Sequence, residues 1–175
     1  WIKRPSFTKL IFSLLALLLF QTSCFVSIWK AQLEKEFIVF HVKKTTLLAE
    51  RIGRNVTVYT NDSIPKNNVV KSYLVANFSL LKTQKKLQNV AYFKNKKILI
   101  IDSTGVYPNT AKANIVLITH SPKINLDRLL QKNHPELIIA DASNYKSYIK
   151  VWKATCIKEK IPFHSTGEKG FYRLK

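Results

Sequence analysis

Residues 10–29 form an apolar run of twenty residues without a charged side chain. A bilayer core about 30 Å thick requires about 20 apolar residues in helical form. Gln21 and Thr22 are polar, but a helix accommodates such side chains through bonds to its own backbone or to neighbouring helices. Trp29 closes the run, where an aromatic belt would lie. The run predicts a transmembrane anchor over residues 1–30, followed by a soluble domain over residues 31–175.

A cleaved lipoprotein signal remains an alternative interpretation of this run. Lys3, Arg4 and Lys9 form a basic start, and Cys24 follows the apolar stretch at the position of a lipidated cysteine. The apolar residues continue past Cys24 to Trp29, which a cleaved signal does not require. Lysines flank both ends of the run, so the positive-inside rule assigns no orientation.

Composition restricts the classes of partner. The chain has 175 residues, a net charge of +19 and no methionine, so we expect it to be a piece of a longer protein. A basic surface attracts nucleic acid or anionic lipid, although an AT-rich genome also enriches lysine. The two cysteines, Cys24 and Cys156, lack metal-ligand spacing and lie too far apart to define a disulfide framework.

The first part of the domain has the pattern of antiparallel hairpins. Residues 36–42, 46–52 and 56–60 are rich in β-branched and aromatic residues and are separated by turn signals. Residues 69–81 favour a helix. A further hairpin is predicted from strands at 90–93 and 97–102.

The second part alternates strands and helices. Residues 114–120 and 136–141 are apolar runs typical of strands covered on both faces. A helix capped by Asn125 lies between them, and a helix capped by Ser143 or Asn144 follows to about Lys158. Final strands are predicted at 161–164 and 171–174. Together these elements predict an α/β sandwich with a mixed sheet.

Three polar side chains end predicted neighbouring strands: Asp102, His120 and Asp141. Ligands bind at the carboxyl ends of strands in open α/β sheets, so these residues are the candidate site. The alternative is that strand ends are polar because the chain leaves the core there. A lysine stripe, Lys146, Lys150 and Lys153, lies on one face of the last predicted helix. It is either a solvated face or a DNA backbone contact.

Several segments, in order, resemble the C-terminal part of the ComEC competence-protein family. Residues 114–130 (NIVLITHSPKINLDRLL) are similar to a family segment that reads roughly DVLKVGHHGSxxS, with His120 on its first histidine. Residues 136–144 (ELIIADASN) resemble the strand and serine–asparagine turn that follow it. Residues 97–102 look like the strand that ends in Gly-Asp, which places Asp102 on that aspartate.

The rest of the domain fits the same resemblance. Residues 36–60 are similar to the opening strands around the family's DVGQGD, and residues 161–174 match its ending. The resemblance implies a shortened metallo-β-lactamase-like domain after the last membrane helix of a polytopic DNA-uptake protein. It also implies a bacterial inner membrane with the domain on the periplasmic side. The expected partners are membrane lipid, the remainder of the polytopic protein and single-stranded DNA.

The departures from the family pattern bear on catalysis. The metal-binding H-x-H-x-D-H motif is absent from the sequence, and DVGQGD has become HVKKTT. Two-metal hydrolysis requires several imidazoles and a bridging carboxylate. We therefore expect a non-catalytic domain with no metal or other cofactor, and with Asp102, His120 and Asp141 as a vestigial site. The alternatives are a residual metal-dependent nuclease that uses these three residues, and a basic lipoprotein of unknown role.

Overall fold

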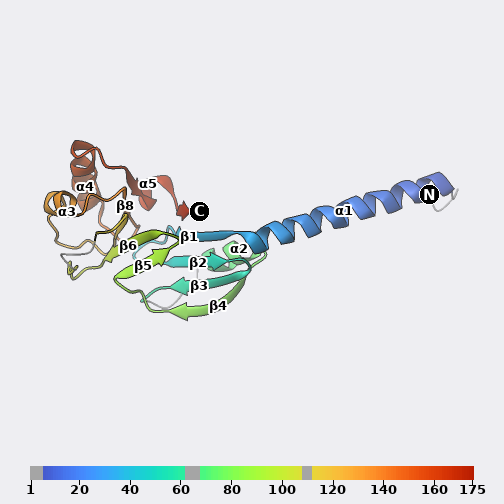
Figure 1. The fold of residues 1–175 in the computed structure, drawn as a ribbon, viewed down its shortest axis with the longest axis horizontal. Coiled ribbons are helices and arrows are strands. Elements are labelled where there is room, and N and C mark those ends of the chain that lie inside the picture. The colour runs from blue at the N-terminus through green and yellow to red at the C-terminus, as the bar shows by residue number, and fades with distance from the viewer. Residues whose placement is uncertain (1–5, 62–67, 108–111) are drawn as a thin grey trace.

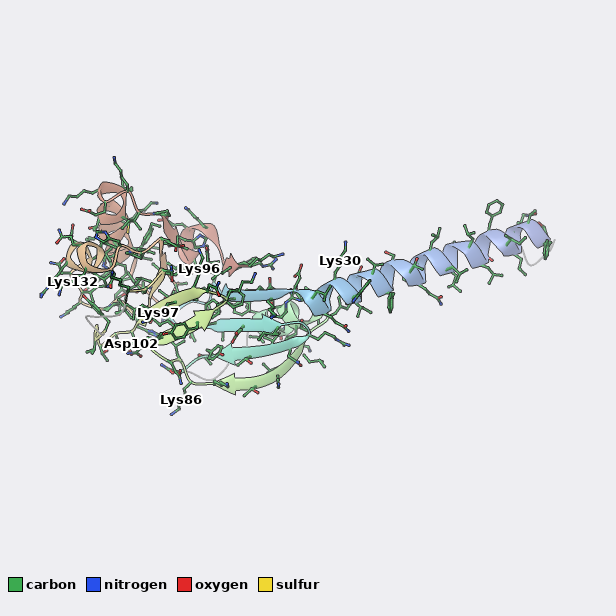
Figure 2. The ribbon with its side chains drawn as sticks, viewed as in Figure 1. Lys30, Lys86, Lys96, Lys97, Asp102 and Lys132 are labelled. Carbon is green, nitrogen blue, oxygen red and sulfur yellow. The ribbon has the colours of Figure 1, made fainter. Side chains whose placement is uncertain are left out.

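The computed structural model describes residues 6–61, 68–107 and 112–175. The first element of the described residues is helix α1 (Phe7–Leu33), whose first turn is capped by Ser6. None of its residues is buried, and α1 projects away from the domain with side chains on all sides, touching the domain at its carboxyl end (Figure 2). α1 is long and apolar enough to cross a membrane. It continues through Cys24 without a break and ends beyond the predicted boundary at residue 30. Two residues of the basic start, Lys3 and Arg4, lie outside the described residues.

Five strands form the first sheet, sheet A, in the order β10-β1-β2-β3-β4. Their bounds are β1 (Lys35–Val39), β2 (Leu48–Ile52), β3 (Asn55–Tyr59), β4 (Leu80–Lys85) and β10 (Tyr172–Leu174). β1, β2 and β3 pair antiparallel, as the predicted hairpins require, and β4 pairs parallel to β3. The last strand, β10, returns to pair with β1, so the end of the chain lies beside its first strand.

Five more strands form sheet B, in the order β5-β6-β7-β8-β9. Their bounds are β5 (Val90–Phe93), β6 (Lys96–Ile101), β7 (Ile115–Ile118), β8 (Leu137–Ala140) and β9 (Phe163–Ser165). β5 and β6 form the predicted hairpin, and β6 to β9 are all parallel. The helices are α2 (Val69–Ala76), α3 (Leu126–Asn133), α4 (Lys146–Lys158) and α5 (Thr166–Lys169).

The two sheets pack face to face between helices (Figure 1). Alternating strand residues separate the layers, because successive side chains point to opposite faces. In β6, Ile98 and Ile100 belong to the core between the sheets, while Leu99 and Ile101 pack under α3 and α4. α2 covers the other face of sheet A through Val70. The predicted α/β sandwich with mixed sheets is confirmed.

One predicted element is partly wrong. Residues 69–81 were expected to be one helix, but α2 ends at Ala76 and β4 begins at Leu80. β4 is exposed along its whole length. Because neither face of β4 is buried, its sequence lacks the alternation that marks a half-buried strand.

The end of α1 is bonded directly to the hairpin of β2 and β3. The Arg51 guanidinium donates to the Ala31 carbonyl at 3.2 Å. The Gly53 N–H donates to the Glu34 carbonyl at 2.9 Å. Gly53 has a φ of 60°, and a Cβ there would lie 2.7 Å from the Gln32 carbonyl oxygen. This junction therefore joins the helix to the sheet through backbone contacts that leave no room for a side chain.

Gly53→Ala is expected to destabilise the chain by about 1–3 kcal/mol, because the methyl group combines a left-handed φ with a backbone clash. Urea unfolding of the full chain in detergent measures the loss. Gly105→Ala is the matched control, because Gly105 has a φ of 66° but its nearest neighbour is a side-chain methyl at 3.3 Å. Equal losses in the two variants would contradict a tight junction.

Candidate functional site

The three predicted site residues follow neighbouring parallel strands, as expected. Asp102 follows β6, His120 comes two residues after β7, and Asp141 follows β8. Ile118 of β7 is in register with Ile101 of β6 and with Ala140 of β8. The three residues therefore lie at the carboxyl edge of sheet B.

Asp141 is the centre of a buried hydrogen-bond network. Its side chain is 1% exposed. One carboxylate oxygen accepts from the Thr46 hydroxyl at 2.5 Å, and the other accepts from the Ser143 hydroxyl at 2.5 Å and the Asn144 amide at 3.0 Å. Burial raises the pKa of Asp141, while the hydrogen bonds from Ser143 and Thr46 and the nearby His120 act in the opposite direction.

His120 joins this network through its backbone. Its N–H donates to the Ser143 hydroxyl at 2.7 Å, and the next N–H, of Ser121, donates to the Asn144 side chain at 2.7 Å. His120 and Ser121 have φ values of 57° and 53°. Two consecutive left-handed residues that are not glycine are strained, so the surrounding hydrogen bonds must stabilise this backbone conformation. The loop after β7 is thus locked to the loop after β8.

Asp102 stands apart from the other two residues. Its carboxylate accepts from the backbone N–H of Thr104 at 3.0 Å and from the Thr104 hydroxyl at 2.6 Å. This is an Asx turn, which holds the loop after β6. No hydrogen bond or ion pair within residues 6–61, 68–107 and 112–175 joins Asp102 to His120 or Asp141.

An open pocket of about 370 Å³ lies over this edge, lined by Lys44, His120, Ser143 and Tyr145. Lys44 carries a positive charge, and the ring nitrogens of His120 can donate or accept hydrogen bonds. Tyr145 adds a hydroxyl group and an aromatic ring and is 70% exposed, whereas the Ser143 hydroxyl proton is donated to Asp141. This combination suits a phosphate group with an adjacent flat ring.

The residues present do not fit the two-metal centre of a hydrolase. No group of three or more His, Cys, Asp or Glu side chains in the described part of the chain is arranged to hold a metal ion. The Asp141 carboxylate already accepts hydrogen bonds from three neighbouring side chains. A pair of ions requires several imidazoles and a bridging carboxylate, which this donor set does not supply.

The predicted lysine stripe is only partly open. Lys146 and Lys150 are exposed near the start of α4. Lys153 forms an ion pair with Glu168 of α5 at 2.7 Å. Lys146 follows the pocket residue Tyr145 in the chain and is exposed, whereas the charge of Lys153 is partly neutralised.

The caps predicted for α4 are wrong. α4 begins after Tyr145, and neither Ser143 nor Asn144 caps it. Both side chains are instead used to join the two loops, and the Tyr145 N–H donates to the Ser121 hydroxyl at 2.7 Å. Tyr145 precedes the helix and is exposed. Thr46 was missed: it lies in the HVKKTT segment, and only the fold brings it to Asp141.

The fold and the site define a mixed α/β domain with a basic pocket at the carboxyl edge of its parallel strands, joined to an apolar helix. The family model described as ComEC C-terminal domain matches residues 37–175. The chain belongs to this family, whose members are membrane-associated proteins of competence and DNA uptake. Searches of curated proteins and of solved structures found no match.

Proposed function

We propose that this chain is the last membrane helix and a non-catalytic, metal-free C-terminal domain of a ComEC-like protein, and that the domain guides single-stranded DNA. The pocket of Lys44, His120, Ser143 and Tyr145 carries the proposal. It occupies the sheet edge where a hydrolase of this family would hold metal ions, and it offers a positive charge and an aromatic ring in their place. Such a surface holds a DNA strand without cutting it.

Charge and topology support this role. The net charge of +19 draws DNA toward the domain, and Lys146 and Lys150 extend the positive surface from the pocket along α4. α1 spans the bacterial inner membrane in this proposal, with lipid as its partner and the domain on the periplasmic side. The remainder of the polytopic protein would form the channel. The layered α/β architecture and the order of the matched segments support a metallo-β-lactamase-like ancestry.

Removing the pocket's charge and ring should weaken DNA binding and its dependence on salt. We expect the full chain in detergent to bind fluorescent single-stranded DNA with an affinity that falls steeply with salt. The variant Lys44→Gln/Tyr145→Ala/Lys146→Gln should lose about 1–3 kcal/mol of binding from the ring. Its log–log salt slope should also fall by about 0.7 for each phosphate that the variant no longer neutralises. A titration across a salt series measures both quantities.

Lys97→Gln/Lys86→Gln is the control for net charge, because Lys97 lies at the end of β6 opposite Asp102 and Lys86 directly follows β4 of sheet A (Figure 2). Equal losses of DNA affinity in the pocket variant and the control variant would mean that binding depends only on the net charge of the chain. The same titration includes Zn²⁺ and Mn²⁺. Cleavage of the DNA that depends on metal and is lost in His120→Ala would replace this proposal with the residual nuclease.

A further inference from the structure

Exposed hydrophobic side chains gather at the end of the domain where α1 leaves. Figure 1 shows α2, the turn between β2 and β3 and the start of β4 at this end. The side chains are between 43% and 70% exposed and are here called the junction tip: Ile52, Val75, Phe78, Leu80 and Leu81. Single exposed hydrophobic residues are ordinary, but a gathering at one end of a domain marks an interaction surface.

Hydrogen bonds hold the junction tip close to the end of α1. Gly53 is bonded to Glu34, and the next residue, Arg54, accepts from the Leu80 N–H at 2.7 Å. The Arg54 side chain donates to the Phe78 carbonyl at 3.1 Å. The tip is therefore linked to the helix by a short series of direct bonds.

The length of α1 places this junction in the headgroup layer. Residues 10–29 span about 30 Å at about 1.5 Å per residue, which matches the hydrocarbon core. Leu33 lies about 6 Å beyond Trp29 along the helix, and the headgroup layer is about 5–8 Å deep on each side. Gln32 and Glu34 contact the β2–β3 turn at this depth.

Phe78 shows that the tip is not built for the domain's own packing. It has a φ of 51° and is 51% exposed. A bulky residue in the left-handed region is strained, and here the side chain is only half buried. Lys30, Arg54 and Lys71 are exposed around the tip and would reach anionic headgroups, as basic side chains do at membrane interfaces.

We propose that the junction tip is a second membrane contact, in which Phe78, Leu80 and Ile52 insert into the headgroup and upper acyl region of an anionic bilayer. This inference rests on the proposed crossing of α1. It fixes the orientation of the domain, with β2, β3 and α2 at the lipid surface and sheet B carried away from it. The pocket over sheet B then faces the aqueous phase, where a DNA strand approaches.

An environment-sensitive fluorophore on single cysteines tests the contact in the full chain. The chain is reconstituted into vesicles of equal parts phosphatidylcholine and phosphatidylglycerol, with nitroxide lipids as quenchers at a shallow or a deep position. One variant carries the probe at Phe78→Cys in a Cys24→Ser background, and its control carries it at Tyr92→Cys, an exposed aromatic position on β5. A third sample is labelled at native Cys24 to report on α1. Cys156 stays in place, because it is fully buried and burial raises the pKa of its thiol to about 12.

The proposal expects emission from the Phe78 position to shift to shorter wavelength and to be quenched more by the shallow nitroxide than by the deep one. The Tyr92 probe should be quenched by neither. Quenching at Cys24 without quenching at Phe78 would overturn the second contact while leaving the crossing of α1 intact. A shift at Phe78 without lipid quenching would overturn it in favour of a second copy of the chain. Absence of quenching at Cys24 would overturn the crossing and the tip contact together.

Discussion

Arg51→Met is expected to lower the free energy of unfolding of the full chain by about 3–5 kcal/mol, because it leaves buried Glu36 without its principal counter-charge. The Arg51 and Glu36 side chains are 1% and 0% exposed, and Arg51 Nε lies 2.8 Å from a Glu36 carboxylate oxygen. Glu36 also accepts from the Tyr73 hydroxyl and lies 3.1 Å from Arg173. Thermal unfolding in detergent, followed by circular dichroism, should show a loss on the order of 10 °C.

The same substitution disconnects the helix from the sheet. Arg51 holds the carboxyl end of α1 through Ala31, and it pairs with Glu34 at 2.5 Å. That hydrogen bond lowers the pKa of Glu34. Arg51→Met should therefore also loosen the domain relative to α1.

Two further variants separate the causes of the loss. Lys96→Met breaks an exposed pair with Glu136 and should change the melting temperature little, since solvent screens such pairs. Glu36→Leu added to Arg51→Met removes the stranded carboxylate and should recover part of the stability. A melting temperature for Arg51→Met as high as that of Lys96→Met would contradict a structural role for the pair.

Much of this fold follows from the periodicity of the sequence. The apolar runs around Ile115 and Ile138 predict parallel strands, since only a strand covered on both faces is apolar throughout. Asn125 is a confirmed helix cap, because its side chain accepts from the Arg128 N–H. These signals are local, so a window of a few residues contains them.

The parts that the sequence did not predict depend on distant partners. β4 is an edge strand with no buried face, and α5 has only four residues, so neither leaves a periodic signal. Thr46 lies 95 residues from Asp141, and no local pattern marks it as a site residue. The pairing of Glu36 with Arg51 was not predicted either, although the two residues lie opposite each other on antiparallel strands, where opposite charges attract.

Asp141→Ala is the second large effect, with an expected loss on the order of 3–5 kcal/mol. The substitution removes the carboxylate acceptor of the Thr46 hydroxyl and of the Ser143 hydroxyl and N–H, whereas the Asn144 amide keeps the carbonyls of Ile118 and residue 141. Each buried unpaired group costs about 1–3 kcal/mol. Thr46 is 2% exposed and Ser143 is partly buried, so water does not readily replace the carboxylate. The loss should extend to DNA binding, because the same network positions His120 and Ser143 in the pocket. Urea unfolding and the DNA titration measure the two effects.

Asp141→Asn separates the hydrogen bonds from the charge. The amide oxygen still accepts from Ser143 and Asn144, and the amide N–H donates to the Thr46 oxygen, so this variant should lose much less stability than Asp141→Ala. Burial raises the pKa of Asp141 in the folded chain above its ordinary value of 3.8. The folded state therefore keeps this proton to a higher pH than the unfolded state does.

The sign of the pH dependence follows from that difference. As pH rises from about 4 through the raised pKa, the unfolded state loses its proton first, so Asp141 makes the folded chain progressively less stable. Asp141→Asn cannot ionise, so its stability relative to the native chain should rise across this window and level off above it. Unfolding curves for both chains at several pH values test this. A relative stability that falls with pH would mean that the hydrogen bonds from Thr46 and Ser143 outweigh burial, and that the site holds a carboxylate of lowered pKa.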